Sequence, residues 1–301
     1  MREFYSNGKL LISGEYVVLD GAKALALPTK FGQSLTVTPI DEPKLIWKSY
    51  NRDKSLWFEG TFEIENGKLK PNQNNETSDR IVQIIQAAKT LNPDFLSSNQ
   101  GCTISTALTF PKNWGLGTSS TLINNIADWA KVDAFELLKN TFGGSGYDIA
   151  CAQNDAPITF QRTPNGIEVN TLDFSPEFKE HIYFVYLNEK QNSREGIATY
   201  NSNKSNIKPV ISEINEITSK LINCDSFKQF EDLLTQHETI ISKVTKQQPV
   251  KDRLFPDFNG VVKSLGAWGG DFVLVTSEGN PTAYFKEKGF HTVIPYSDMI
   301  L

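Results

Sequence analysis

The order of apolar and polar residues predicts an α+β protein built in two parts. Segments typical of strands and of helices are mixed along the 301 residues without a strict strand–helix–strand alternation, which disfavours a doubly wound sheet. A chain of this length is about twice a typical domain, so one large or two modest domains are expected. We place the domain boundary between an N-terminal part, residues 1–175, and a C-terminal part, residues 176–301.

Strand-like segments dominate the first part of the chain. Short apolar runs are separated by turn signals such as Ser13-Gly14 and Asp20-Gly21. The expected strands are Leu10–Ile12, Tyr16–Leu19, Ala24–Leu27, Leu35–Thr38, Leu45–Trp47, Ser55–Phe58 and Cys102–Phe110. The polar segment Pro71–Asp79 should be a loop that leads into a helix at Arg80–Ala88, with Ser78 or Asp79 as its N-cap.

Helices and strands are mixed in the remainder. Helical spacing of apolar residues predicts helices from Thr121 and at Ala134–Leu138, Val210–Leu221, Phe227–Lys243 and Asp257–Leu265. The expected strands are Ile158–Phe160, Gly166–Val169, Ile182–Leu187, Phe272–Thr276, Thr282–Phe285 and His291–Ile294. The first two of these should form a hairpin, and the polar segment Tyr200–Pro209 should be a linker or loop.

Composition excludes several classes of function. The net charge is −5 and no long basic run occurs, which argues against nucleic acid or an anionic membrane as the main partner. The three cysteines are widely separated and form no CxxC pair, so neither a disulfide framework nor a zinc site is indicated. Charged residues precede the first apolar run, unlike a signal peptide, and no apolar segment is long enough to span a membrane. A soluble cytoplasmic protein, monomeric or homodimeric, is expected.

The segment Pro111–Ser120 carries the strongest functional signal. It joins the expected strand Cys102–Phe110 to the helix after Thr121, and it reads Pro-Lys-Asn-Trp-Gly-Leu-Gly-Thr-Ser-Ser. Gly115 and Gly117 allow the backbone to approach a ligand, while unpaired N–H groups and the helix dipole favour an anion. The segment therefore predicts a phosphate site without the usual P-loop ending. The alternative is an ordinary loop with a Ser/Thr helix cap.

Three further segments could supply charged or tightly packed groups. Lys9 to Tyr16 places a lysine, a glycine bend and a carboxylate in one stretch, although Lys9 could also be a solvated residue before an edge strand. Gly143 to Asp148 contains small residues before an acid, which could bind a ligand or merely cap a helix. Gly266 to Phe272 is a second glycine turn before an apolar strand, where a tight helix–strand connection is the alternative.

Together these segments resemble the GHMP family of small-molecule kinases, which includes galactokinase, homoserine kinase, mevalonate kinase and phosphomevalonate kinase. The resemblance extends over nearly the whole chain, with the Lys9, Pro111 and Gly266 segments matching the three family motifs in order. The Gly-Ser-Gly-Tyr-Asp and Gly-Gly-Asp steps point to the phosphomevalonate and mevalonate kinase branch. Two departures are Thr118, which replaces a serine, and Trp268, which replaces a glycine and would narrow the pocket or alter the acceptor.

The resemblance implies a fold and a set of residue roles. The fold would be an N-terminal ATP-binding domain like ribosomal protein S5 and a C-terminal ferredoxin-like α/β sandwich, with the active site between them. Asp148 would orient or deprotonate the acceptor, and Lys9 would neutralise charge in the transition state. The residues implied to hold the ATP phosphates are Gly115, Leu116, Gly117, Thr118, Ser119 and Ser120. Those implied on the acceptor side are Glu15, Lys190, Ser193, Arg194, Ala267, Gly269, Gly270 and Asp271. Ser119 is an implied ligand of Mg²⁺, and Glu136 is the second, with Asn140 as the alternative where related kinases place a glutamate.

The implied activity is transfer of a phosphoryl group from ATP, with Mg²⁺, to a small acid of the mevalonate pathway. The acceptor would be mevalonate or phosphomevalonate. Asp148 would act as a base on an alcohol, whereas it would only position a phosphate monoester, whose oxygen is already ionised. A decarboxylase of diphosphomevalonate with the same architecture and a non-catalytic nucleotide or metabolite sensor remain alternatives.

Overall fold

The computed structural model describes residues 1–65, 68–97 and 100–301, and the chain forms two compact units. Unit 1 contains Met1–Gly8, Phe31–Lys112 and Leu116–Gln153, and unit 2 contains Lys9–Lys30, Asn113–Gly115 and Asn154–Leu301. The sequence predicted one boundary after residue 175, whereas the two units alternate along the chain. They alternate because the long strands β1 (Arg2–Ser13) and β2 (Ala24–Ile40) each contribute residues to both.

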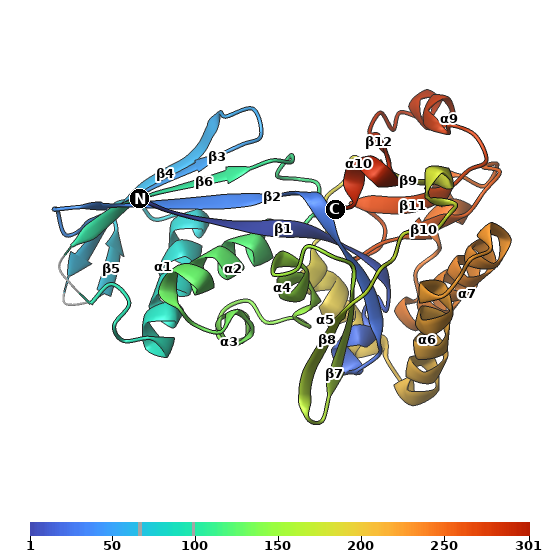
Figure 1. The fold of residues 1–301 in the computed structure, drawn as a ribbon, viewed down its shortest axis with the longest axis horizontal. Coiled ribbons are helices and arrows are strands. Elements are labelled where there is room, and N and C mark those ends of the chain that lie inside the picture. Colours follow the sequence, from blue (N-terminus) through green and yellow to red (C-terminus); the bar gives the residue numbers. More distant parts are fainter. Residues whose placement is uncertain (66–67, 98–99) are drawn as a thin grey trace. The chain divides into compact units, whose positions relative to one another are not determined.

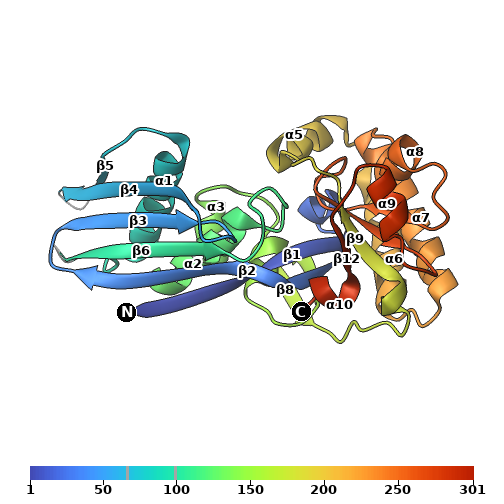
Figure 2. The same cartoon turned by 90° about the horizontal axis from the view of Figure 1, so that it is seen from above.

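Unit 1 is a sheet with helices on one face. The strand order is β5 (Lys68–Pro71), β4 (Leu56–Glu65), β3 (Lys44–Tyr50), β6 (Gly101–Leu108) and the second half of β2. The helices are α1 (Glu76–Leu91), α2 (Thr118–Ala130), α3 (Ala134–Lys139) and α4 (Tyr147–Ala152). The strands β4, β3, β6 and β2 lie side by side in Figure 2, and α1 and α2 lie below the sheet in Figure 1. Trp47, Phe62, Ile104 and Ile126 are buried in the core between these layers.

Unit 2 contains a second sheet of antiparallel neighbours, with the order β10 (Val262–Ser264), β11 (Phe272–Thr276), β9 (Ile182–Tyr186) and β12 (Val293–Pro295). The first residues of β2 pair separately with the hairpin of β7 (Ile158–Thr163) and β8 (Gly166–Thr171). The helices are η1 (Val17–Asp20), η2 (Lys179–His181), α5 (Ser193–Asn203), α6 (Ile207–Ile222), α7 (Phe227–Thr245), α8 (Val250–Leu254), α9 (Thr282–Glu287) and α10 (Tyr296–Met299). Helices α6 and α7 pack side by side, and α7 contacts β10.

Three predicted elements are wrong. Tyr16–Leu19 is not a strand, because Tyr16 has φ 63° and the following residues form the short helix η1. Asp257–Leu265 is not a helix, because Gly260 has φ 154° and Val262–Ser264 pairs with β11. Thr282–Phe285 is helical rather than extended, since it follows Pro281, and proline favours a helix start. Short apolar runs do not distinguish strand from helix without their tertiary neighbours.

Two predicted boundaries also change. Tyr200–Pro209 is largely helical: α5 continues to Asn203 and α6 begins at Ile207. Burial of Tyr200, which is 1% exposed, stabilises α5 where the polar composition suggested a linker. Ala24–Leu27 and Leu35–Thr38 belong to the single strand β2. Within the described residues, no helix combines the length and the apolar character required to cross a bilayer.

The N-cap of α1 is Asn75 and not Ser78 or Asp79. Its side chain accepts a hydrogen bond from the N–H of Ser78 at 2.9 Å. We expect Asn75→Ala to lower the free energy of unfolding by about 1 kcal/mol, because one N–H at the start of the helix loses its partner. Asp79→Ala should cost clearly less, and urea unfolding of the two variants compares them. An equal cost would contradict the assignment of Asn75 as the cap.

Candidate functional site

The start of α2 presents backbone N–H groups. Gly117 precedes the helix with φ 98°, a left-handed conformation that favours glycine, and no side chain in the described part of the chain caps it. The hydroxyls of Ser120 and Thr121 donate to the carbonyl oxygen of Gly117 at 2.9 and 3.0 Å. These hydroxyls therefore turn back toward the loop. The first N–H groups of a helix have no partner within the helix, so this end favours an anion.

Buried polar contacts hold α2 in place within unit 1. Thr121 Oγ1 donates to Gln33 Oε1 at 2.7 Å, and Asn125 Nδ2 donates to the Gln33 carbonyl at 2.9 Å. Ser6 Oγ donates to Asn125 Oδ1 at 2.8 Å. Because buried polar groups strongly favour a satisfied geometry, these bonds orient α2 on β1 and β2. The sequence did not indicate these residues, since isolated Gln and Asn residues carry no pattern.

Asp148 lies in the first turn of α4 and is not its N-cap. Gly146 precedes the helix with φ 100°, and the Asp148 carboxylate accepts a hydrogen bond from the N–H of Ile149 at 3.2 Å. Its side chain is partly exposed. Helix α4 packs against α2, and Gln153 Nε2 donates to Asn124 Oδ1 at 3.0 Å. Asp148 is therefore not the N-cap residue of α4, although its carboxylate bonds to an N–H of the first turn.

The two predicted metal ligands lie on different helices of unit 1. Ser119 is exposed in the first turn of α2. Glu136 is exposed on α3 and forms an ion pair with Lys139 at 3.3 Å. Among the described residues, no group of three or more His, Cys, Asp or Glu side chains could hold a metal ion.

Unit 2 brings together three of the segments selected from the sequence. Lys9, on β1, donates from Nζ to the carbonyl oxygen of Gly115 at 2.9 Å. A Cβ atom at Gly115, whose φ is 69°, would lie 2.3 Å from Asp271 Cγ, so the carboxylate packs directly on this glycine. Burial raises the pKa of Asp271, while the positive charges of Lys9 and Lys190 act in the opposite direction. The N–H of Gln191 donates to Asp271 Oδ1 at 3.2 Å.

Aromatic side chains hold residues 113–115 on the second sheet. Tyr186, at the end of β9, donates from its hydroxyl to the carbonyl oxygen of Asn113 at 3.0 Å. The Trp114 ring packs against the rings of Phe272 and Tyr186, with distances of 5.4 and 6.4 Å between the ring centroids. The glycine turn is thus positioned by β9 and β11, a role that the sequence did not predict for these residues.

The second glycine turn, residues 266–271, is held by side chains on both sides. The Tyr16 hydroxyl donates to the carbonyl oxygen of Ala267 at 2.7 Å, and Arg253 Nη2 donates to that of Gly269 at 2.9 Å. Trp268 has φ 59° and is 2% exposed, packed with Tyr16 and Tyr200. The indole therefore lies in the core of unit 2, where it supports the turn. A Cβ atom at Gly270 would lie 2.7 Å from the carbonyl oxygen of Glu189.

The other acceptor-side candidates lie in two different environments. Lys190, Ser193 and Arg194 are exposed at the start of α5, whose N-cap is Asn192. Glu15, in contrast, is completely buried and forms an ion pair with Lys263. The structure therefore places Glu15 away from solvent, and its proposed role below is structural.

The close packing at Gly115 predicts that adding a single methyl group at this position lowers the stability of the protein. We expect Gly115→Ala to destabilise the protein by about 1–2 kcal/mol from the left-handed backbone and by about 1–3 kcal/mol more from the clash with Asp271. Gly289→Ala is the matched control, because Gly289 has φ 90° and nothing lies within 4 Å of a Cβ atom there. Urea unfolding compares the variants, and equal losses would show that the contact with Asp271 does not constrain Gly115.

Comparison with known proteins gives a clear result only at the level of structure. No protein-family model matches the sequence, and no curated protein sequence matches it. The mevalonate kinase of Methanococcus jannaschii has 17% identity and a TM-score of 0.70, over 97% of this chain and 96% of that one. The phosphomevalonate kinase of Streptococcus pneumoniae, in complex with phosphomevalonate and AMPPNP, has 16% identity and a TM-score of 0.70, over 100% and 98%. The galactokinase of Lactococcus lactis, complexed with galactose, has 12% identity and a TM-score of 0.69, over 95% and 88%.

These similarities show that the chain has the α+β fold of the GHMP kinases. The α+β fold class predicted from the sequence is therefore confirmed. A fold hosts many activities, so the reaction and its substrate have to be argued from the residues themselves.

Proposed function

We propose that the chain is an ATP-dependent kinase of the GHMP type that transfers a phosphoryl group to mevalonate or phosphomevalonate. The observation that carries this proposal is the convergence of Lys9, Gly115 and Asp271, from three segments far apart in the sequence. Structural neighbours that are a mevalonate kinase, a phosphomevalonate kinase and a galactokinase support the class of reaction. The acceptor is inferred from the Gly-Ser-Gly-Tyr-Asp and Gly-Gly-Asp steps.

Each proposed role follows from the chemistry of phosphoryl transfer, which needs alignment and positive charge more than covalent catalysis. The N–H groups at the start of α2 and the backbone of Gly115–Ser120 would hold the phosphates. The Lys9 ammonium group would neutralise charge on the transferred group. Asp148 would take the proton of an alcohol acceptor or position a phosphate acceptor. Lys190, Ser193, Arg194 and the turn Ala267–Asp271 would contact the acceptor.

Magnesium fits the exposed oxygen groups of unit 1. Mg²⁺ bound to nucleotide phosphates usually takes only one or two ligands from the protein. Ser119 would offer a hydroxyl at the start of α2, and Glu136 a carboxylate whose exposed pairing with Lys139 is weak. The ion would supply charge neutralisation for the phosphates.

The proposal is tested by supplying purified protein with ATP, Mg²⁺ and either mevalonate or phosphomevalonate and measuring ADP. Release of ADP that depends on one acceptor supports the proposal and names the substrate. Release of carbon dioxide with ADP from diphosphomevalonate would instead identify a decarboxylase. Binding of ATP without ADP release for any acceptor would identify a sensor and reject the kinase.

A further inference from the structure

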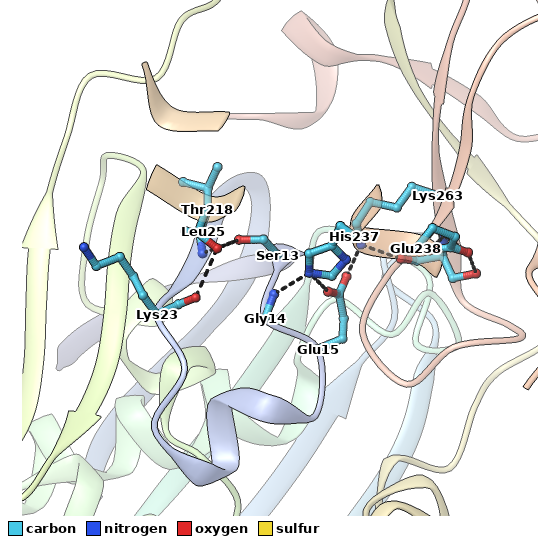
Figure 3. Close-up of polar contacts among 10 residues, drawn as sticks. Ser13, Gly14, Glu15, Lys23, Leu25, Thr218, His237, Glu238 and Lys263 are labelled. Carbon is cyan, nitrogen blue, oxygen red and sulfur yellow. Dashed lines mark hydrogen bonds and ion pairs between the residues drawn. The ribbon is translucent and has the colours of Figure 1, made fainter. Parts of the chain in front are cut away.

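Four ionisable side chains form a buried cluster in unit 2. Glu15, His237 and Lys263 are 0% exposed and Glu238 is 5% exposed. Figure 3 shows them converging from the loop after β1, from α7 and from β10. Lys263 Nζ contacts Glu15 Oε1 and donates to the carbonyl oxygen of Ser264 at 2.9 Å. A buried charge cluster of this kind is costly unless it is electrically balanced.

The hydrogen bonds of the cluster indicate that His237 is neutral. Its Nε2 accepts a hydrogen bond from the N–H of Gly14 at 2.9 Å, so the ring proton is on Nδ1. Burial and the charge of Lys263 lower the pKa of His237 well below its usual value. The single cation Lys263 therefore faces two carboxylates, Glu15 and Glu238, and balances only one of them.

A bound proton would balance the second carboxylate. Glu15 Oε2 has no hydrogen-bond donor among the described residues and faces His237 Nε2 at 3.3 Å. Two acceptor atoms at this distance repel unless a proton lies on one of them. Glu238 accepts from the N–H and the hydroxyl of Ser264, at 3.1 and 2.7 Å. Burial raises the pKa of Glu238 to about 7 and also raises that of Glu15, which favours a proton bound to one of these two acids.

The cluster also connects two segments of the candidate site. Glu15 and Tyr16 follow the strand that carries Lys9, and Lys263 and Ser264 precede the turn that ends in Asp271. Tyr16 bonds to Ala267 in that turn, next to the contacts of the cluster. The end of β1 is held further by a hydrogen bond of 2.8 Å between the hydroxyls of Ser13 and Thr218.

We propose that Glu15, His237, Glu238 and Lys263 form a proton-binding cluster that positions the strand of Lys9 against the turn of Asp271. Loss of the bound proton leaves an unbalanced buried charge and loosens this arrangement. These residues act through Lys9 and Asp271 and are positioning residues. The effect on turnover rests on the proposed kinase activity, whereas the proton binding itself does not.

Stability measurements on the full chain test the proton binding without any substrate. A folded-state pKa of about 7 at Glu238, above the unfolded value of 4.5, means that stability is lost as the pH rises from about 4.5 to about 7. Glu238→Gln removes this loss, so its unfolding temperature should rise relative to the wild type across that range. The lowered pKa of His237 makes the stability of both proteins increase as the pH rises. This contribution is the same in the variant and the wild type, so it cancels in the comparison. Asp232→Asn, an exposed residue of the same helix paired with Lys228, should show no such trend.

Turnover provides the second measurement. Above about pH 7, the ratio of kcat for Glu238→Gln to that of the wild type should rise by up to about tenfold per pH unit, with KM for ATP little changed. The proposal would be overturned if Glu238→Gln and Glu15→Gln both kept the pH dependence of the wild type, in stability and in turnover. A change in stability without any ADP release would support the proton cluster and reject the kinase.

A measurement on the wild-type protein tests the proposal even if the variants do not fold. The infrared carbonyl band of a protonated carboxyl group should be present in the wild type at about pH 6 and disappear by about pH 8. The absence of this band at both values would overturn the proposal.

Discussion

Replacement of Asp148 by asparagine should lower the rate of ADP release by about 10²–10⁴-fold if the acceptor is an alcohol. The substitution keeps the size of the side chain and removes its ability to accept a proton. Asp148 lies in the first turn of α4, on a helix that packs against α2, and its side chain is partly exposed. The fold should therefore be retained, and circular dichroism together with steady-state kinetics separates the two effects.

The pH and acceptor dependence of this variant distinguishes the two proposed roles. With a phosphate monoester the loss should be smaller and should appear mainly in KM for the acceptor, because no proton has to be removed. Asp155→Asn is a suitable control, since Asp155 is an exposed carboxylate shortly after α4. Lys9→Ala should also abolish most of the activity. Unchanged turnover in both Asp148→Asn and Lys9→Ala would reject the site assignment.

Replacement of Lys263 by methionine should lower the free energy of unfolding by about 3–5 kcal/mol. Methionine fills a similar volume, so the loss arises from the charge. Without the ammonium group, the Glu15 carboxylate is left buried with no cation, and burial already raises its pKa. Chemical unfolding at neutral pH measures this effect directly.

Two further variants show whether the loss comes from the unpaired carboxylate. Lys263→Met combined with Glu15→Gln should recover part of the stability, because the buried charge is then removed from both partners. Lys288→Met removes the cation of an exposed pair with Asp257, at 2.9 Å, and should cost at most about 1 kcal/mol. Equal losses for Lys263→Met and Lys288→Met would contradict the assignment of a buried ion pair.

Local patterns predicted many of the elements because their information is short in range. The strand β6, the following glycine turn and helix α2 were expected from alternation, glycine spacing and helical periodicity, and all three are present. The hairpin of β7 and β8 was expected from the Pro164–Gly166 turn. The errors at Tyr16–Leu19 and Asp257–Leu265 occur where a tertiary contact decides the backbone: the Gly14–His237 bond in one case and pairing with β11 in the other.

The candidate site was predictable in part. Lys9, Gly115 and Asp271 were selected from separate motifs, and the structure shows that they lie together. Tyr186, Gln191 and Lys263 were not selected, because each is a single residue whose role depends on its partner in space. Lys263 did carry one signal, since it is a lysine within an apolar stretch. Because a helix was predicted there, the sequence did not indicate that this lysine is buried in a strand. The role of Asp148 stays a prediction.

The sequence by itself determined the fold class, the glycine turn that joins β6 to α2 and the residue types available for charge and proton transfer. These properties depend on local periodicity, glycine conformation and side-chain chemistry, which a linear pattern records. Only the tertiary structure decided that Trp268 supports the core, that Glu15 pairs with Lys263 and that Asp271 packs on Gly115. Burial and pairing depend on which distant segments of the chain come into contact. They therefore determine how much stability is lost when a charge is removed or a methyl group is added at a given position.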